Sequence, residues 1–302
     1  MLQTVTEQAC AKINLTLHVT GQRADGYHLL DSLVVFATIA DTLTATPADE
    51  TTLTITGPFA ASIPASADNL VLRAARLVPS DTHLAFTLHK ALPVASGLGG
   101  GSADAAATLR TIAAFALTST LAHEYLDIAA ARAGELGADV PVCLASEPAR
   151  MRGAGEQLSP LEIPPCWITL ANPGVAVPTP TVFRALAHKN NLPMPDTLPN
   201  SQTASDLALW LRHQRNDLQA PAITMAPVIA DVLASLAQQP GALISRMSGS
   251  GATCFALFAT SSEAEAAANR IRKFNPDWWT AAGRVLNTPR VKPTLQEIRA
   301  TT

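Results

Sequence analysis

The chain has 302 residues, of which 48% are hydrophobic and 15% are charged, a composition typical of a soluble, well-packed protein with two domains. Its net charge of −3 gives no reason to expect nucleic acid or an anionic membrane as a partner. The first eight residues do not follow the pattern of a signal peptide, and no apolar run approaches the roughly 20 residues of a membrane helix. We therefore expect a cytoplasmic protein.

Cysteine usage supports the same expectation. The four cysteines are scattered along the chain, with neither a C-x-x-C motif nor a Cys/His spacing typical of metal ligands. We expect reduced, buried thiols and no metal bound by protein side chains. The residues concerned are Cys10, Cys143, Cys166 and Cys254.

The N-terminal segment reads as a strand, because apolar residues alternate from Ile13 to Val19. Lys12 and Asn14 lie on the opposite face of this strand. Two interpretations stay open for that polar face: it is turned to solvent, or it lines a cleft.

A polar loop with glycines follows at residues 21–28 and ends in Tyr27 and His28. These two are either ordinary loop residues or a pair that stacks on and hydrogen-bonds a base or a sugar. Further strands complete a mostly antiparallel or mixed sheet with the first one, and we predict them over residues 31–46, 51–56 and 84–88.

A glycine-rich loop, Pro93 to Gly101, stands between the strand at 84–88 and an Ala-rich helix predicted over residues 102–117, with Ser102 or Asp104 as its cap. Glycines let the backbone come close to a ligand, and the free N–H groups and positive dipole end of a helix attract an anion. The order of strand, glycine loop and helix predicts a phosphate site, although glycine runs also make ordinary loops. The loop is not a Walker A motif, because no Gly-Lys-Ser/Thr follows.

Asp139 follows a helix predicted over residues 121–136 and precedes Pro141 and an apolar run that we interpret as a strand. Asp is a favoured turn residue, so a structural role is one interpretation. The other is a positioned carboxylate that acts as a general base.

The remaining elements place a domain boundary at Pro164-Pro165, which gives domains of residues 1–163 and 164–302. The first domain also contains a helix at 69–77 capped by Asp68 and a hairpin at 149–161. Helices interleaved with strands predict an α/β sandwich for the second domain. Its helices are predicted at residues 180–187 (capped by Thr179), 204–213, 226–238 and 262–274, its strands at 167–170, 243–247, 253–258 and 280–286, and an exposed loop at 190–203.

The glycine loop resembles the phosphate loop of the GHMP kinases, named for galactokinase, homoserine, mevalonate and phosphomevalonate kinases. Further motifs of one branch of that family occur in order: Ala11 to Leu15, Gly26 to His28, Gly137 to Pro141, Asn172 to Gly174, Asn216 to Leu218 and Ser248 to Ala252. The resemblance implies an α+β, two-domain fold with an N-terminal mixed sheet with helices, a C-terminal α/β sandwich and an active site in the cleft between them.

The branch it resembles phosphorylates the tertiary 2-hydroxyl of a methylerythritol unit that carries cytidine diphosphate, in the non-mevalonate isoprenoid pathway. The resemblance implies ATP as phosphoryl donor, a small-molecule cytidylyl substrate, and Lys12 and Asp139 as the catalytic pair. It implies substrate contacts by Asn14, Tyr27, His28, Phe183 and Gly249, with Tyr27 stacked on the cytosine and Phe183 as a second ring. It implies an ATP site formed by Asn69, Leu70, Val71, Lys90, Pro93, Val94, Ala95, Ser96, Gly97, Leu98, Gly99, Gly100, Gly101, Ser102 and Ala103.

Two departures from the family pattern affect the loop. Ala95-Ser96 stands where members often have further glycine or alanine, and Ala103 where many have a second serine. We therefore predict no protein ligand for a metal and expect Mg²⁺ to arrive with the nucleotide.

Three rival interpretations stay open. Another GHMP kinase, of the homoserine or mevalonate type, would have no base to stack on Tyr27. A non-catalytic member that only binds nucleotide or sugar would not need both Lys12 and Asp139. A nicotinamide-binding domain is the third. We expect a monomer or a weak homodimer.

Overall fold

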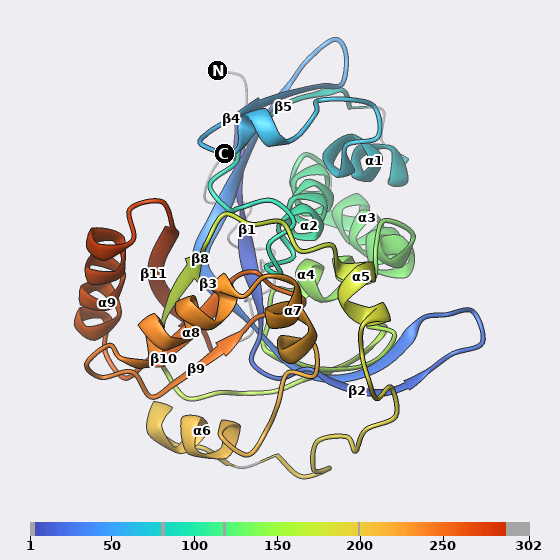
Figure 1. Ribbon diagram of the computed structural model, residues 1–302. Helices are drawn as coiled ribbons and strands as arrows, with labels where there is room; N and C mark the ends of the chain where they lie inside the picture. The colour runs from blue at the N-terminus through green and yellow to red at the C-terminus, as the bar shows by residue number, and fades with distance from the viewer. Residues whose placement is uncertain (1–3, 80–81, 117–118, 199, 288–302) are drawn as a thin grey trace.

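The computed structural model describes residues 4–79, 82–116, 119–198 and 200–287. One long strand, β3 (His28–Pro47), runs through the molecule and organises its first half (Figure 1). It pairs antiparallel with β1 (Val5–Asn14), β2 (His18–Gln22), β5 (Leu84–His89) and β6 (Ala149–Gly153), and β6 pairs with β7 (Gln157–Pro160). Only β4 (Thr52–Thr56) adds a parallel pairing, with β5, among the described strands of this half. The sheet is therefore mixed, as the sequence predicts.

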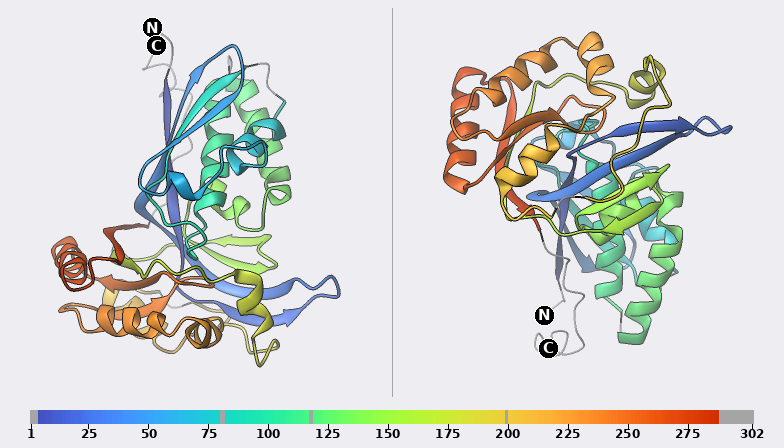
Figure 2. Two further views of the ribbon diagram at one scale, coloured as in Figure 1. Left: turned by 45° about the horizontal axis from the view of Figure 1, so that its top comes forward. Right: turned by 90° about the horizontal axis from the view of Figure 1, so that it is seen from below.

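Four helices cover one face of this sheet (Figures 1 and 2): α1 (Leu70–Leu77), α2 (Gly100–Ala114), α3 (Ser119–Arg132) and α4 (Val140–Ala145). The central helix, α2, buries most of its alanines against β1 and β3. Short side chains let a helix lie close to a sheet, which explains the Ala-rich composition. Two short 3₁₀ helices, Ala60–Ser62 and Ala133–Glu135, complete the half.

The second half extends the same sheet. Strand β11 (Trp279–Leu286) pairs with β3 at one end and with β8 (Trp167–Asn172) along its length, and β10 (Cys254–Phe258) and β9 (Ile244–Met247) follow. Its helices are α5 (Thr179–Arg184), α6 (Ala204–Leu211), α7 (Gln219–Met225), α8 (Val228–Ala237) and α9 (Ser261–Phe274). The division at residues 163 and 164 stays a prediction.

Three predicted N-cap residues are wrong. Asn69, not Asp68, caps α1, because its Oδ1 accepts the Val71 N–H. The N-cap of α2 is Gly99 in the left-handed conformation with φ 62°, so neither Ser102 nor Asp104 caps that helix. Thr179 lies inside α5, and Pro178 precedes it.

Three other elements differ from the sequence analysis. The strand predicted from Ile13 to Val19 is two strands, because β1 ends at Asn14 and β2 begins at His18. The apolar run after Asp139 is the helix α4 rather than a strand, and Pro141 lies in its first turn, where a proline costs no hydrogen bond. Helix α7 was not predicted.

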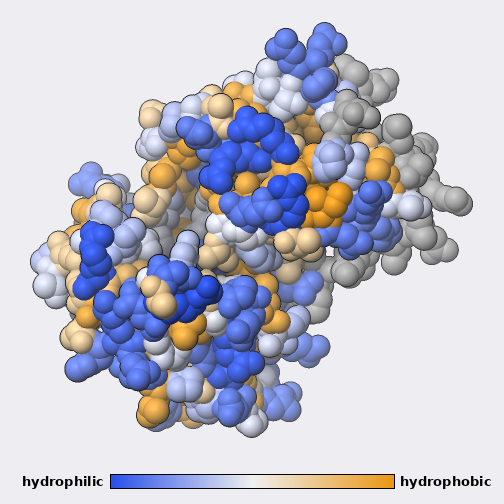
Figure 3. Space-filling view, turned by 90° about the vertical axis from the view of Figure 1, so that its right-hand side faces the viewer, coloured by the Kyte–Doolittle hydropathy of each residue, from blue (hydrophilic) through white to orange (hydrophobic). Residues whose placement is uncertain are grey.

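None of the helices in the described ranges is long and apolar enough to cross a bilayer. On the face shown in Figure 3, hydrophilic and hydrophobic residues are interspersed, and the hydrophobic ones form small groups.

Candidate active site

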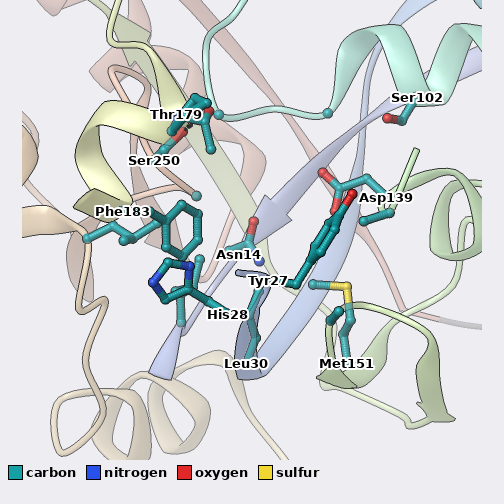
Figure 4. Close-up of a pocket in the computed structure, with 18 of the residues that line it drawn as sticks. Asn14, Tyr27, His28, Leu30, Ser102, Asp139, Met151, Thr179, Phe183 and Ser250 are labelled. Atoms are coloured by element: carbon teal, nitrogen blue, oxygen red, sulfur yellow. Dashed lines mark hydrogen bonds between the residues drawn. The ribbon is translucent and has the colours of Figure 1, made fainter. Parts of the chain in front are cut away.

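A pocket of about 790 Å³ lies where the two halves of the chain meet. Its lining comes from segments far apart in sequence: the end of β1, the β2–β3 hairpin, the glycine loop, the start of α4, helix α5 and the turn at Gly249-Ser250 (Figure 4). These segments include every motif that the sequence analysis singled out as functional in the first half.

An ion pair lies on one side of the pocket. The Nζ atom of Lys12 is 2.7 Å from Oδ2 of Asp139. Lys12 is buried, whereas the Asp139 side chain is one-third exposed and faces the pocket. Asp139 stands at the N-cap position of α4, yet its carboxylate caps no N–H of that helix and bonds to Lys12 instead.

The polar face of the first strand therefore lines a cleft, and the solvent interpretation is wrong. Lys12 and Asn14 are only 4% and 1% exposed, and both line the pocket. The Lys12 N–H donates to the carbonyl of Leu98, which ties β1 to the glycine loop. Asn14 donates through Nδ2 to Ser32, while its Oδ1 is buried and has no partner among the described residues.

The glycine loop packs so tightly that a side chain would not fit at Gly97 and would be crowded at Gly99. A Cβ atom at Gly97, where φ is 79°, would lie 2.3 Å from the carbonyl oxygen of Ser248. A Cβ atom at Gly99 would lie 3.3 Å from Cβ of Lys12. The loop thus brings the start of α2 beside the ion pair. The first N–H groups of a helix have no partner within it, and together with the helix dipole they favour an anion, so the phosphate site stays the prediction for this end of the pocket.

An aromatic pair occupies another side of the pocket. The rings of His28 and Phe183 stack with centroids 4.6 Å apart and planes inclined by 26° (Figure 4). Burial lowers the pKa of His28, and the nearby ammonium of Lys189 lowers it further. Nε2 of His28 is buried and has no hydrogen-bond partner in the described part of the chain. The imidazole is thus poised to bind a ligand in its neutral form.

Tyr27 lies on the exposed side of the pocket. Its side chain lines the pocket but is 61% exposed, and it stands apart from the stacked pair (Figure 4). Phe183 stacks on His28, and the contacts of Tyr27 and Phe183 with a cytosine stay predictions. Because the ring is exposed, its side chain has room to turn and contact a base bound in the pocket.

The predicted ATP residues divide into two groups. Eight of them line the pocket: Leu70, Ala95, Ser96, Gly97, Gly99, Gly100, Gly101 and Ser102. Others have side chains buried in the hydrophobic core, so any contact with a nucleotide would be through their backbone, and their part in the ATP site stays a prediction: Val71, Leu98 and Ala103. Three further predicted ATP residues lie outside the pocket lining: Asn69, which caps α1, and Pro93 and Val94 of the loop. Among the predicted substrate residues, Gly249 lines the pocket.

Lys90 is turned away from the pocket. Its ammonium does not reach the pocket, because Nζ binds Oδ2 of Asp41 at 2.5 Å and Oδ2 of Asp104 at 2.6 Å. The residue is 1% exposed. Two of the three N–H donors of this ammonium are held by buried carboxylates, and Lys90 lies outside the pocket lining, so the structure does not bring the ammonium to a nucleotide. Its place in the ATP site stays a prediction.

The sequence analysis missed part of the lining. Thr179 of α5 and Ser250 of the turn between β9 and β10 are 71 residues apart in sequence, and their hydroxyl oxygens lie 2.7 Å apart (Figure 4). Arg184 and Lys189 add two cations to the pocket, and Lys189 contacts Gln22 of the β2–β3 hairpin at 3.4 Å. Arg184 directly follows Phe183, and Ser250 lies within the Ser248 to Ala252 motif, but no motif marks Thr179 or Lys189.

The described residues contain no group of three His, Cys, Asp or Glu side chains that could hold a metal ion. Asp139, the carboxylate beside the start of α2 that lines the pocket, is paired with Lys12. This donor set suits a metal that is bound mainly by the oxygens of a polyphosphate rather than by the protein.

Comparison with known proteins decides the family. Residues 69–147 match the model of the GHMP kinases N terminal domain, and residues 200–277 match that of the GHMP kinases C terminal domain. A 4-diphosphocytidyl-2-C-methyl-D-erythritol kinase of Cereibacter sphaeroides is 57% identical over 279 residues, which cover 92% of this chain and 98% of that protein. The chain belongs to the 4-diphosphocytidyl-2-C-methyl-D-erythritol kinases.

Other relatives place the chain in the same kinase family. The 4-diphosphocytidyl-2-C-methyl-D-erythritol kinase of Paracoccus denitrificans is 54% identical over 91% of this chain and 95% of its own. A crystal structure of 4-(cytidine 5'-diphospho)-2C-methyl-D-erythritol kinase matches with a TM-score of 0.73 and 31% identity, over 94% of this chain and all of that one. The predicted α+β, two-domain GHMP kinase fold is confirmed. Homoserine kinase from Cytophaga hutchinsonii, at 17% identity and a TM-score of 0.59, shares the fold.

Proposed function

We propose that this protein transfers the γ-phosphate of ATP to the 2-hydroxyl of 4-diphosphocytidyl-2-C-methyl-D-erythritol, with Lys12 and Asp139 as its catalytic pair. The observation that carries the proposal is the ion pair of Lys12 and Asp139, 2.7 Å apart, beside the N-terminus of α2. The membership of the family supports the choice of substrate.

The chemistry assigns a part to each of these groups. The loop and the start of α2 hold the phosphates of ATP, and phosphoryl transfer depends mainly on such positioning and charge stabilisation. As the 2-hydroxyl oxygen attacks the γ-phosphorus and the bond to ADP breaks, the hydroxyl proton passes to the carboxylate of Asp139. The Lys12 ammonium orients that carboxylate and compensates negative charge on the transferring group.

The other side of the pocket supplies recognition of the cytosine. His28 is fixed by its stack on Phe183 and offers a buried ring nitrogen to the polar edge of the base. The exposed ring of Tyr27 covers a face of the base, and Asn14 offers its free Oδ1 to polar groups of the substrate. Mg²⁺ accompanies the ATP, which supplies its oxygen ligands. The enzyme works in the cytoplasm, as a monomer or weak homodimer.

The assignment of Tyr27 gives a specificity prediction. We expect Tyr27→Ala to raise KM for the cytidylyl substrate by a factor that corresponds to the roughly 1–3 kcal/mol of a stacked base. KM for ATP should stay near its parent value, because the phosphate loop is unchanged. Since the ring is 61% exposed, its removal leaves the core intact. Steady-state kinetics with each substrate varied in turn measure the effect, and Tyr27→Phe, which keeps the ring, is the control. A normal KM in Tyr27→Ala would mean that the ring only covers the protein surface.

A substrate panel tests the function itself. The purified protein is incubated with ATP, Mg²⁺ and one alcohol at a time, and ADP release is followed for the cytidylyl substrate, homoserine and mevalonate. We expect release with the cytidylyl substrate alone. ADP release with homoserine or mevalonate instead would select the other GHMP kinases, and binding without any release would select a non-catalytic member.

A further inference from the structure

Three charged side chains lie buried together beneath the glycine loop. Nζ of Lys90 binds Oδ2 of Asp41 and Oδ2 of Asp104, at 2.5 and 2.6 Å. The exposed fractions of Lys90, Asp41 and Asp104 are 1%, 0% and 3%. They come from three elements, because Asp41 belongs to β3, Lys90 follows β5, and Asp104 is in the second turn of α2. We refer to them as the Asp41–Lys90–Asp104 cluster.

The cluster touches the phosphate loop from the side opposite the pocket. A Cβ atom built on Gly100, the first residue of α2, would lie 3.1 Å from Nζ of Lys90 and 3.7 Å from Oδ2 of Asp41. Gly100 itself lines the pocket. Asp41 also accepts hydrogen bonds at Oδ1 from the N–H groups of Ala91 and Leu92, which lead into the loop. One layer of backbone therefore separates the ammonium from bound phosphates.

The charges of the cluster do not balance. Two ionised carboxylates and one ammonium sum to −1, directly beneath a site that must accept a polyanion. Oδ1 of Asp104 is buried and has no hydrogen-bond partner among the described residues, whereas Oδ2 binds Lys90. A buried carboxylate oxygen that accepts no hydrogen bond makes the charged form of Asp104 costly and favours a proton on this carboxyl group.

The titration tendencies agree with this geometry. Burial raises the pKa of Asp104 to about 7, against the effect of the Lys90 ammonium, and the carboxylate of Asp41 adds to the rise. Burial alone would lower the pKa of Lys90, but the two carboxylates outweigh it and raise that pKa, so the lysine stays charged.

We propose that Lys90 is a positioning residue for the phosphates of ATP, acting through the backbone of Gly100, and that Asp104 takes up a proton from solvent when nucleotide binds. Protonation at Oδ1 of Asp104 removes one negative charge, so the cluster becomes neutral instead of repelling the phosphates. The inference rests on the proposed function, because it takes ATP to bind at the loop. It also explains why a lysine next to the loop is turned away from the pocket.

Few other titratable groups face Asp104 from the elements packed around it. Cys143 of α4 interacts with Asp104 electrostatically, and burial raises the pKa of Cys143 far above neutral pH, so it stays a neutral thiol. The pair of Arg110 and Glu7 joins α2 to β1 further along the helix, and the pair of Lys12 and Asp139 lies beyond the loop. Proton uptake near pH 7 is therefore assigned to the cluster.

Calorimetry of nucleotide binding tests the proposal. A Mg²⁺-saturated, non-hydrolysable ATP analogue is titrated into the full chain, without the alcohol substrate, in buffers of different ionisation enthalpy at pH 7 to 8. We expect uptake of a fraction of a proton by the parent protein. Asp104→Asn, which keeps the size of the side chain, should abolish that uptake and bind the analogue more tightly at pH 8, by up to about tenfold for each pKa unit involved. At pH 6 the two proteins should bind alike.

The controls distinguish a failure of this inference from a failure of the proposed kinase function. Glu265→Gln removes an exposed carboxylate of α9 and should keep the parent's proton uptake. Equal uptake by the parent and Asp104→Asn would overturn the inference while leaving the proposed function intact. A parent protein that binds no nucleotide would overturn both.

A second variant tests the lysine. Lys90→Met should weaken binding of the analogue by roughly tenfold or more, since a charge is lost within a few ångströms of the phosphates. KM for the cytidylyl substrate should change little, and Lys90→Arg should recover part of the affinity for the analogue. A folded Lys90→Met with parent affinity would refute the positioning role. If Lys90→Met does not fold, the result with Asp104→Asn decides.

Discussion

Asp139→Asn is expected to lower kcat by roughly 10²–10⁴-fold, the usual contribution of a general base. The amide keeps the size of the side chain and can still accept a hydrogen bond from Lys12, but it cannot take the proton of the attacking hydroxyl. Because one-third of the Asp139 side chain faces the pocket and it caps no helix N–H, the fold should not depend on its charge. Single-turnover kinetics with both substrates bound measure the chemical step directly.

Binding must be measured alongside the rate. We expect Asp139→Asn to bind ATP and the cytidylyl substrate with affinities close to those of the parent. Asp127→Asn, in the exposed part of α3, is the matched control and should leave kcat unchanged. If folded Asp139→Asn worked within a few-fold of the parent rate, Asp139 would be a turn residue and the proposed mechanism would be wrong.

The features that were predictable from sequence are local ones. The glycine loop could be recognised because strand, glycines and helix follow one another within about 30 residues, and each element has its own pattern. Its glycines then fit the structure for a specific reason, since Gly97 approaches the backbone of Ser248 too closely for any side chain. The pair of Lys12 and Asp139 came from the family resemblance, and no spacing between residues 127 positions apart could have given it.

The partners of buried charges could not be predicted. Lys90 meets Asp41 from 49 residues away and Asp104 from 14, and only the packing of α2 on the sheet brings them together. A lysine beside a glycine loop is typical of a nucleotide ligand, and without its two carboxylates that interpretation is the natural one. Burying an unpaired ammonium is costly, which explains why the ammonium of Lys90 binds two carboxylates in the structure instead of lining the pocket.

Short apolar segments were ambiguous for another reason. The run from Val140 to Ala145 makes only one and a half turns, so periodicity cannot separate a buried helix from a strand. Helix α7 has seven residues and a proline, and its place is fixed by packing against α5 and α8. The sequence predicted that Tyr27 and His28 belong to a binding site, and both line the pocket. Which of the two rings stacks on Phe183 depends on side-chain rotamers, which the sequence does not show.

Lys12→Met is the companion experiment to Asp139→Asn, and we expect it to lower kcat by roughly 10²–10³-fold, as the loss of one preorganised charge at a developing anion does. Methionine fills the space of the buried lysine stem, which alanine would leave empty, because Lys12 is only 4% exposed. KM for the cytidylyl substrate should stay close to the parent value, since Tyr27 and His28 are unchanged. The kinetic split between kcat and KM separates lost transition-state stabilisation from lost binding.

The double variant Lys12→Met, Asp139→Asn decides whether the two residues act as one unit. Their side chains are 2.7 Å apart, and groups in contact are not expected to contribute independently. If the ammonium serves partly by orienting the carboxylate, then without the carboxylate much of its effect disappears, and the double variant should be little slower than Asp139→Asn alone. Measured on folded proteins that still bind ATP, a double-variant loss equal to the product of the two single losses would mean that Lys12 acts on the phosphoryl group alone. A loss smaller than this product would mean that Lys12 both orients the Asp139 carboxylate and stabilises the transferring phosphoryl group.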